Sequence, residues 1–256
     1  FYSTNCRTWT QSNVTSGNYV SASYNGIWVA TNGSGYLFYS MDCKTWTKSN
    51  TTFNDTCMDP SYNNGIWVVG SYNGNGLFYS TDGKTWTQSN ITNYHFHQEC
   101  ISYGEIWVAG ATSSEGLFYS TDGKVWTQSD TNYPIEAVRY GDGTWIASAM
   151  DRGLFYSTDG KTWTQSNIKN SSYKIIVYGG GIWAAKPQYS TGIYFSTDGK
   201  TWYKSYNTNH SYKFVSYNNG IWVAGLANGG LFYSTNCRTW TQSNVTSGSY
   251  NFVSYN

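Results

Sequence analysis

The chain alternates short apolar and aromatic runs with short polar segments along its whole length. Residues 213–243 illustrate the pattern, because "KFVSY", "IWVAG", "LFYST" and "TWTQS" are separated by "NNG", "LANGG" and "NCR". Valine, isoleucine and aromatic residues favour strands, and an Asn-Gly pair is typical of a tight hairpin turn. No segment has the periodicity of an amphipathic helix. The pattern therefore predicts four antiparallel strands joined by turns.

This four-strand pattern repeats through the chain. Self-similarity at a period near 40 residues indicates a propeller or solenoid, and a four-stranded unit of about this size matches one propeller blade. We therefore expect an all-β fold, a seven-bladed β-propeller of four-stranded antiparallel blades, forming a single domain over residues 1–256. The tryptophan that marks each repeat occurs at Trp9, Trp46, Trp86, Trp126, Trp163, Trp202 and Trp240.

The two ends of the chain are expected to share the closing blade. Residues 250–255 supply a first strand, and residues 1–12 supply a third and a fourth strand. Joining the N- and C-termini in one blade closes the ring and removes free sheet edges. The second strand of this blade is missing from the sequence. A shortened chain, a distorted closing blade and a strand lent by another molecule all remain open as explanations.

Aromatic residues make up 19% of the chain, and the 13 tryptophans all fall at repeated strand positions, either in the last strand or in "IWVA"-like second strands. Tryptophans can stack on sugars, but a tryptophan at the same strand position in every blade favours burial between blades. Each buried ring removes about 150–250 Å² from water, which is worth roughly 4–6 kcal/mol. We therefore expect the tryptophans to form the core.

The turn before the last strand carries a motif. "STDGKTW", which begins at Ser80, recurs from Ser120, Ser157 and Ser196, with weaker copies from Ser3, Ser40 and Ser234. It resembles the Asp-box, or BNR, repeat of the sialidase-like β-propeller superfamily, although it is one residue shorter between Asp and Gly. The resemblance implies a structural hairpin in which Asp accepts backbone N–H bonds. It also implies that ligands meet the loops at the opposite face, so the repeat is scaffold.

The same resemblance raises the question of sialidase activity. Enzymes of that kind bind the substrate carboxylate with three arginines, but this chain has four in total, and Arg7 and Arg238 belong to turns. Only Arg139 and Arg152 remain, so a sialidase is not expected. Charged residues are 11% of the chain and the net charge is +1, so neither nucleic acid nor an anionic membrane is an expected partner. No cofactor motif is present.

Carboxylates outside the turns lie between residues 55 and 151. Four residues before the first-strand tyrosine, successive blades carry Glu99, Glu136, Lys174 and Lys213, which predicts an arc of charges near the mouth of a central channel. Paired carboxylates can act as acid and base in glycoside cleavage, with Asp59 as a further candidate. The alternative is a ring of solvated charges that neutralise one another. Asp59, Glu99 and Glu136 are the candidate catalytic residues.

Further polar residues are candidates for ligand binding. His95 and His97 share a strand face and have the spacing of zinc ligands, but no third ligand is close, so a polar loop is favoured and no metal is predicted. Cys57 and Cys100 are expected either to form one disulfide or to be two buried thiols. Eight Asn-x-Ser/Thr sequons fall in expected ligand-face loops. The ligand-binding candidates are His95, His97, Asp130, Asp151, Arg152, Lys174 and Lys213.

These features favour a secreted carbohydrate-binding propeller, because loops rich in Tyr, Asn, Ser, Thr and Gly suit neutral polyols. The alternative is a glycoside hydrolase that acts on plant or microbial polysaccharide. A protein-interaction scaffold without chemistry is a third possibility. The expected partner is a glycan or polysaccharide.

Overall fold

The computed structural model describes residues 2–3, 7–8, 10–14, 19–52, 58–226 and 229–248. All of the elements in these residues are strands, and none is a helix. The strands form six four-stranded antiparallel sheets, each made of four consecutive strands. The first three sheets contain β1 (Tyr19–Tyr24), β2 (Trp28–Asn32), β3 (Tyr36–Ser40) and β4 (Thr47–Thr52); β5 (Ser61–Asn63), β6 (Ile66–Gly70), β7 (Leu77–Ser80) and β8 (Thr87–Gln88); and β9 (Phe96–Tyr103), β10 (Trp107–Ala111), β11 (Leu117–Ser120) and β12 (Thr127–Gln128). The other three contain β13 (Ile135–Gly141), β14 (Thr144–Ala149), β15 (Gly153–Ser157) and β16 (Thr164–Gln165); β17 (Tyr173–Gly179), β18 (Ile182–Pro187), β19 (Tyr194–Ser196) and β20 (Tyr203–Lys204); and β21 (Tyr212–Asn218), β22 (Ile221–Leu226), β23 (Leu231–Ser234) and β24 (Thr241–Gln242).

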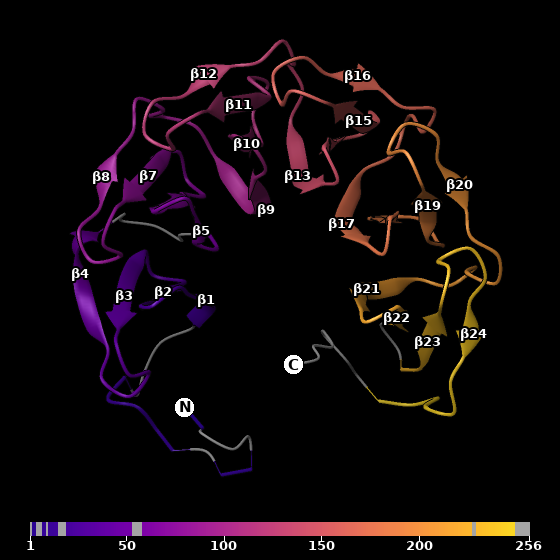
Figure 1. Ribbon diagram of the computed structural model, residues 1–256, viewed down its shortest axis with the longest axis horizontal. Helices are drawn as coiled ribbons and strands as arrows, with labels where there is room; N and C mark the ends of the chain where they lie inside the picture. The colour runs from indigo at the N-terminus through magenta and orange to yellow at the C-terminus, as the bar shows by residue number, and fades with distance from the viewer. Residues whose placement is uncertain are drawn as a thin grey trace.

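The six sheets follow one another around a central opening in a propeller-like arrangement (Figure 1). The first strand of each sheet lies nearest the opening, and the fourth strand lies at the periphery. The predicted all-β class and the four-strand unit are therefore confirmed. The predicted closing blade falls largely on residues outside the described part of the chain. Within that segment, Tyr2 and Thr10 form an antiparallel bridge with backbone N···O distances of 2.8 and 2.9 Å.

Five of the six second-strand tryptophans lie in the core between neighbouring sheets, as predicted, whereas Trp28 in β2 is only partly buried. Each of these five is at most 2% exposed and packs against the tyrosine at the end of the first strand of its own sheet, as in Tyr140 and Trp145, whose ring centroids are 4.8 Å apart. These buried second-strand tryptophans are Trp67, Trp107, Trp145, Trp183 and Trp222. Five tryptophans after the turns are buried as well, with Trp163 the most exposed of them at 9%; they are Trp86, Trp126, Trp163, Trp202 and Trp240. Trp46, after the turn of the first sheet, is only partly buried.

The turn between the third and fourth strands is held by a serine and an acid. In the second sheet, the Ser80 hydroxyl donates to Asp82 (2.9 Å), and Asp82 Oδ1 accepts the N–H groups of Lys84 and Thr85, both at 2.8 Å. Asn236 accepts the equivalent two N–H groups in the last sheet. The predicted role of these side chains as turn formers, independent of charge, is confirmed.

A side-chain clamp joins consecutive sheets at their outer strands. Asn90 lies just beyond β8; its Oδ1 accepts the N–H of Trp126 in the next sheet, and its Nδ2 donates to the carbonyl of Trp126, both at 2.8 Å. Asn13, Asn50 and Asn167 accept the equivalent tryptophan N–H of the following sheet. Three of these asparagines, at positions 13, 50 and 90, begin sequons that the sequence assigned to the ligand face. The structure uses them in contacts between sheets.

A second contact also recurs at each junction. The cation of one turn lies over the third-strand aromatic ring of the preceding sheet, as Lys124 does over Tyr79 at 5.9 Å and Arg238 does over Phe195 at 5.6 Å. Such contacts are worth about 0.5–1 kcal/mol at exposed sites. Together with the clamp, these contacts join neighbouring sheets at their outer strands.

Candidate functional site

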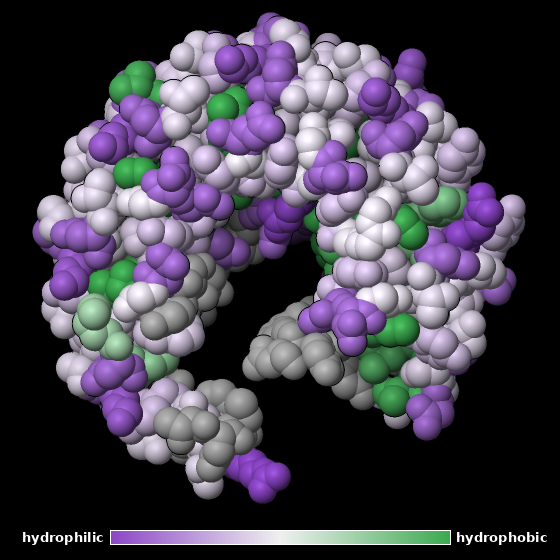
Figure 2. Space-filling model, in the orientation of Figure 1, coloured by the Kyte–Doolittle hydropathy of each residue, from purple (hydrophilic) through white to green (hydrophobic). Residues whose placement is uncertain are grey.

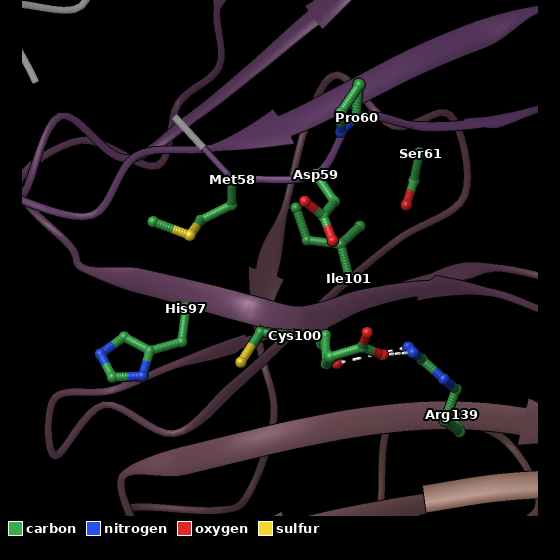
Figure 3. Close-up of a pocket in the computed structure, with 9 residues that line it drawn as sticks. Met58, Asp59, Pro60, Ser61, His97, Cys100, Ile101 and Arg139 are labelled. Atoms are coloured by element: carbon green, nitrogen blue, oxygen red, sulfur yellow. Dashed lines mark hydrogen bonds and ion pairs between the residues drawn. The ribbon is translucent and has the colours of Figure 1, made fainter. Parts of the chain in front are cut away.

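A pocket of about 190 Å³ lies where the inner strands of three successive sheets meet. Asp59 comes from the segment before β5, His97 from β9 and Arg139 from β13, and all three lie around the same hollow (Figure 3). The full lining consists of Met58, Asp59, Pro60, Ser61, His97, Glu99, Cys100, Ile101 and Arg139. In the space-filling view, hydrophilic side chains border the central opening on the side of β9 and β13 (Figure 2).

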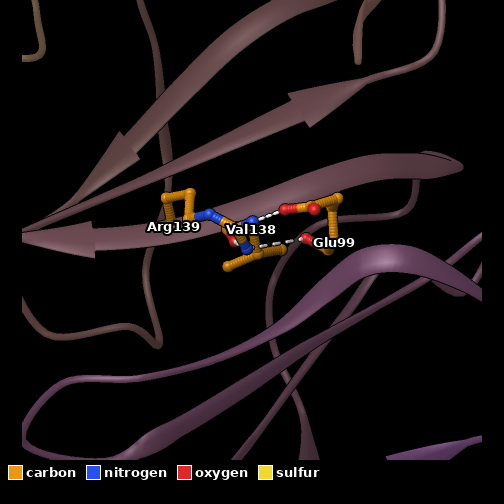
Figure 4. Close-up of polar contacts among 3 residues, drawn as sticks. All are labelled: Glu99, Val138 and Arg139. Atoms are coloured by element: carbon orange, nitrogen blue, oxygen red, sulfur yellow. Dashed lines mark hydrogen bonds and ion pairs between the residues drawn. The ribbon is translucent and has the colours of Figure 1, made fainter. Parts of the chain in front are cut away.

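Glu99 and Arg139 form an ion pair in this pocket (Figure 4). Arg139 Nη1 also donates to the carbonyl of Val138 at 3.1 Å and to that of Glu99 at 3.5 Å. Glu99 has a φ of 66°, a left-handed conformation that is uncommon for a non-glycine residue. It lies in a bulge of β9, where residues 97–100 stand opposite the single residue Gly110 of β10. The bulge explains how Glu99 reaches Arg139 while its neighbours remain in the sheet.

Asp59 is the second carboxylate of the pocket. Its Oδ1 is buried and has no hydrogen-bond partner among the described residues. Burial lowers the pKa of Arg139 from its ordinary value, and the negative charge of Asp59 offsets part of that effect. The guanidinium therefore lies near two carboxylates, and one buried carboxylate oxygen can accept a further hydrogen bond.

Glu136 is 6% exposed on β13, and its charge acts on His97. Burial lowers the pKa of His97; the Glu136 carboxylate opposes this shift, while Lys174 and His95 add to it. The His97 ring also stacks on Tyr72, with centroids 5.1 Å apart. The charges of Glu136 and Lys174 thus both act on His97, whereas Glu99 is paired with Arg139.

The Cys100 thiol is free and fully buried, and it donates to the carbonyl of Ile135 at 3.6 Å. Burial raises its pKa to about 12, so it is an unreactive thiol at neutral pH. The structure therefore contains no disulfide at Cys100. Its expected partner, Cys57, lies outside the described residues.

Other predicted ligand-binding residues lie away from this pocket. Asp130 accepts the N–H of Trp163 at 3.2 Å and thus takes the clamp position that asparagine has elsewhere. Asp151 bonds with Ser172 through both its N–H and its carboxylate. Arg152 lies over the ring of Tyr133 at 5.2 Å.

His95 is exposed, and its Nδ1 is 2.7 Å from the carbonyl of Tyr72. Lys213 is exposed on β21, one sheet beyond Lys174. The described residues contain no group of three His, Cys, Asp or Glu side chains that could hold a metal ion. No helix in the described part of the chain could span a membrane.

Two residues near the site escaped the sequence analysis. Arg139 was named there only to exclude a sialidase, although it replaces the serine that precedes the first-strand tyrosine in other repeats, such as Ser102 and Ser216. Lys186 interrupts the apolar second strand at "AAKP". It is half-buried, and its pKa is lowered by burial and then by the like charge of Lys174. Both residues depart from their own repeat position, which is the signal that could have revealed them.

No family model and no curated protein matches the sequence. Solved structures match the fold with low sequence identity. The computationally designed Ika8 protein has a TM-score of 0.71 and 12% identity, and the match covers 90% of this chain and 74% of Ika8. Virginiamycin B lyase from Staphylococcus aureus has a TM-score of 0.70 and 13% identity, covering 89% of this chain and 84% of the lyase. The GH74 enzyme of Niastella koreensis has a TM-score of 0.52 and 21% identity, covering 84% of this chain and 35% of the enzyme. At these identities the likeness shows a shared β-propeller fold.

Proposed function

We propose that the protein is a carbohydrate-binding propeller whose ligand occupies the pocket around Arg139. The observation that carries the proposal is the grouping of Glu99, Arg139 and Asp59, with one buried Asp59 oxygen that lacks a hydrogen-bond partner among the described residues. A buried polar atom without a partner favours a ligand that supplies a donor. A sugar hydroxyl is such a donor.

The size and chemistry of the pocket support a saccharide. A volume of about 190 Å³ suits one sugar ring rather than an extended molecule. The carboxylates accept hydrogen bonds and Arg139 donates them, which matches neighbouring hydroxyls on a ring. Met58 and Ile101 are buried beside these groups and can contact the C–H face of the ring.

The ion pair favours binding over glycoside hydrolysis. A catalytic acid must carry a proton in the resting enzyme, and the guanidinium of Arg139 stabilises the charged form of Glu99 instead. The GH74 assignment belongs to the enzyme from Niastella koreensis, which shares only 21% identity with this chain. Hydrolysis by this chain would be shown by release of reducing sugar.

The finer architecture is part of the proposal. We infer a seventh blade made from both ends of the chain, turns of the Asp-box kind, and a secreted protein. The last described sheet supports a seventh blade, because side chains that face the next sheet elsewhere are exposed here: Ile221 is 42% exposed and Tyr233 is 45% exposed, whereas Ile27, at the position of Ile221 in the first sheet, is 8% exposed.

Tyr233→Ala tests the seventh blade. If a further turn covers Tyr233, this change should lower the free energy of unfolding by about 1 kcal/mol. Tyr189→Ala, at an 83% exposed side chain, is the control, and equal effects would argue against the seventh blade.

Isothermal titration calorimetry with a panel of neutral and acidic oligosaccharides tests the function. Arg139→Gln should weaken binding by at least tenfold, because it removes the positive charge that pairs with Glu99 and interacts with Asp59. Arg152→Gln is the matched control, since Arg152 lies outside the pocket. Equal affinity of wild type and Arg139→Gln would overturn the assignment of this pocket. Release of reducing sugar by the wild type, lost in Glu99→Gln, would instead establish the hydrolase.

A further inference from the structure

A second hollow of about 430 Å³ lies far from the Arg139 pocket along the chain, between the loop after β20 and the outer strands β23 and β24. Its lining contains no lysine, arginine or carboxylate. Three amides, one imidazole and the edges of two buried rings dominate it. The lining residues are Asn207, Asn209, His210, Phe232, Trp240, Thr241 and Gln242.

The hollow forms where this junction departs from the repeat. Tyr94 packs on Phe118 at 5.1 Å in the third sheet, and Tyr133 packs on Phe155 at 5.7 Å in the fourth. His210 takes this position on Phe232, with a centroid distance of 5.3 Å. An imidazole is smaller than a phenol and places a polar nitrogen at the rim, so the exchange leaves space and adds a hydrogen-bonding group.

The clamp between sheets is also altered here. Tyr206 stands where the other repeats have asparagine or, in one repeat, Asp130, and its side chain is 66% exposed. The contact is made by the main chain instead, because the Tyr206 N–H donates to the carbonyl of Arg238 at 2.8 Å. The sheets therefore stay joined here without the asparagine clamp.

The amide of Gln242 is available to a ligand. At the same repeat position, Gln128 donates to the carbonyl of Glu115 at 2.8 Å, and Gln165 donates to that of Arg152 at 2.6 Å. No described residue receives the equivalent bond from Gln242. Its side chain is exposed and lines the hollow beside Asn209.

We propose that this hollow is a second saccharide site, specific for a neutral sugar. The absence of charged lining groups disfavours a uronate or sulfated sugar, and the amides of Asn207, Asn209 and Gln242 suit uncharged hydroxyls. The inference rests on the proposed function and extends it, since two sites on one chain bind an extended polysaccharide more tightly than either site alone.

Residue-resolved NMR with neutral oligosaccharides tests the inference. The probes are cellopentaose, xylopentaose and chitopentaose, and the protein is made without N-glycosylation because Asn209 lies in a sequon. The side-chain amide signals of Gln242 and Asn209 should shift on titration. His210→Tyr, which introduces the residue found at this position in the third and fourth sheets, should fill the hollow and weaken this binding at least tenfold, while Gln128→Ala should leave it unchanged.

The signals separate the two proposals. Shifts at the Arg139 side chain without shifts at Gln242 would overturn the second site and leave the first intact. Shifts at Gln242 that persist unchanged in His210→Tyr would also overturn the second site. Shifts at Gln242 that survive in Arg139→Gln and vanish in His210→Tyr would establish it as an independent site.

Discussion

The hydrogen bonds between Asn90 and Trp126 are expected to stabilise the junction between two consecutive sheets, and removing them tests how much. Asn90→Ala removes both hydrogen bonds, each 2.8 Å long, between the amide and the Trp126 backbone. One such bond contributes about 1 kcal/mol, and a half-buried N–H left without an acceptor adds a similar penalty. We therefore expect Asn90→Ala to lower the free energy of unfolding by about 2–3 kcal/mol.

Urea unfolding followed by tryptophan fluorescence measures this loss directly. The midpoint should fall while the dependence on urea is unchanged, because the surface exposed on unfolding stays the same. In a thermal scan the same loss corresponds to a fall of roughly 5–10 °C for a chain of this size.

Two further variants make the prediction specific. Tyr206→Ala changes the equivalent position where the main chain makes the contact, so its effect should stay within about 0.5 kcal/mol. Asn90→Asp keeps the acceptor and loses the donor, as Asp130 does naturally, and should cost about half as much as alanine. If Asn90→Ala and Tyr206→Ala destabilise equally, the clamp does not stabilise the junction and the reasoning fails.

Three other measurements follow from single residues. Burial would raise the pKa of Asp159, but hydrogen bonds from the N–H groups of Thr162 and Lys161 outweigh it and lower the pKa to about 2. The ionised carboxylate therefore stabilises the fold above about pH 4, and this stabilisation is lost as the pH falls towards 2. In Asp159→Asn, the free energy of unfolding measured between about pH 4 and about pH 2 should depend less on pH than in the wild type. Gly116→Ala should unfold the protein or destabilise it by more than about 3 kcal/mol, because φ is +75° and a Cβ would lie 2.1 Å from the Thr131 carbonyl oxygen. Gly143→Ala, where φ is +74° but the space is open, should cost about 1 kcal/mol. Equal urea midpoints of unfolding for the two variants would contradict this. Cys100 should resist thiol reagents in native buffer and react only in denaturant, and rapid native labelling detected by mass spectrometry would contradict its burial.

The local sequence pattern was sufficient to predict the strands and turns of the repeating unit. Strand, turn and strand are decided by neighbours in the chain, so "STDGKTW" indicates a turn in which Asp82 accepts the N–H groups two and three residues later. The identical placement of tryptophan in each repeat likewise indicated the core, and the burial of Trp107 and Trp145 agrees. The lengths of the outer strands were less predictable: "TWTQS" forms only Thr87–Gln88 in the second sheet, because an edge strand pairs on one side alone.

The contacts between sheets could not be predicted from the sequence and became clear only from the tertiary structure. Asn90 has the same neighbours as any surface asparagine of a sequon, and only the position of the next sheet, 36 residues further on, gives its amide a partner. Arg139 meets Glu99 across 40 residues, because a bulge in one inner strand faces the next inner strand. Sequence periodicity determined what each blade is made of. The packing of one blade against the next decided which polar side chains meet, because those distances are set by the ring and not by the chain.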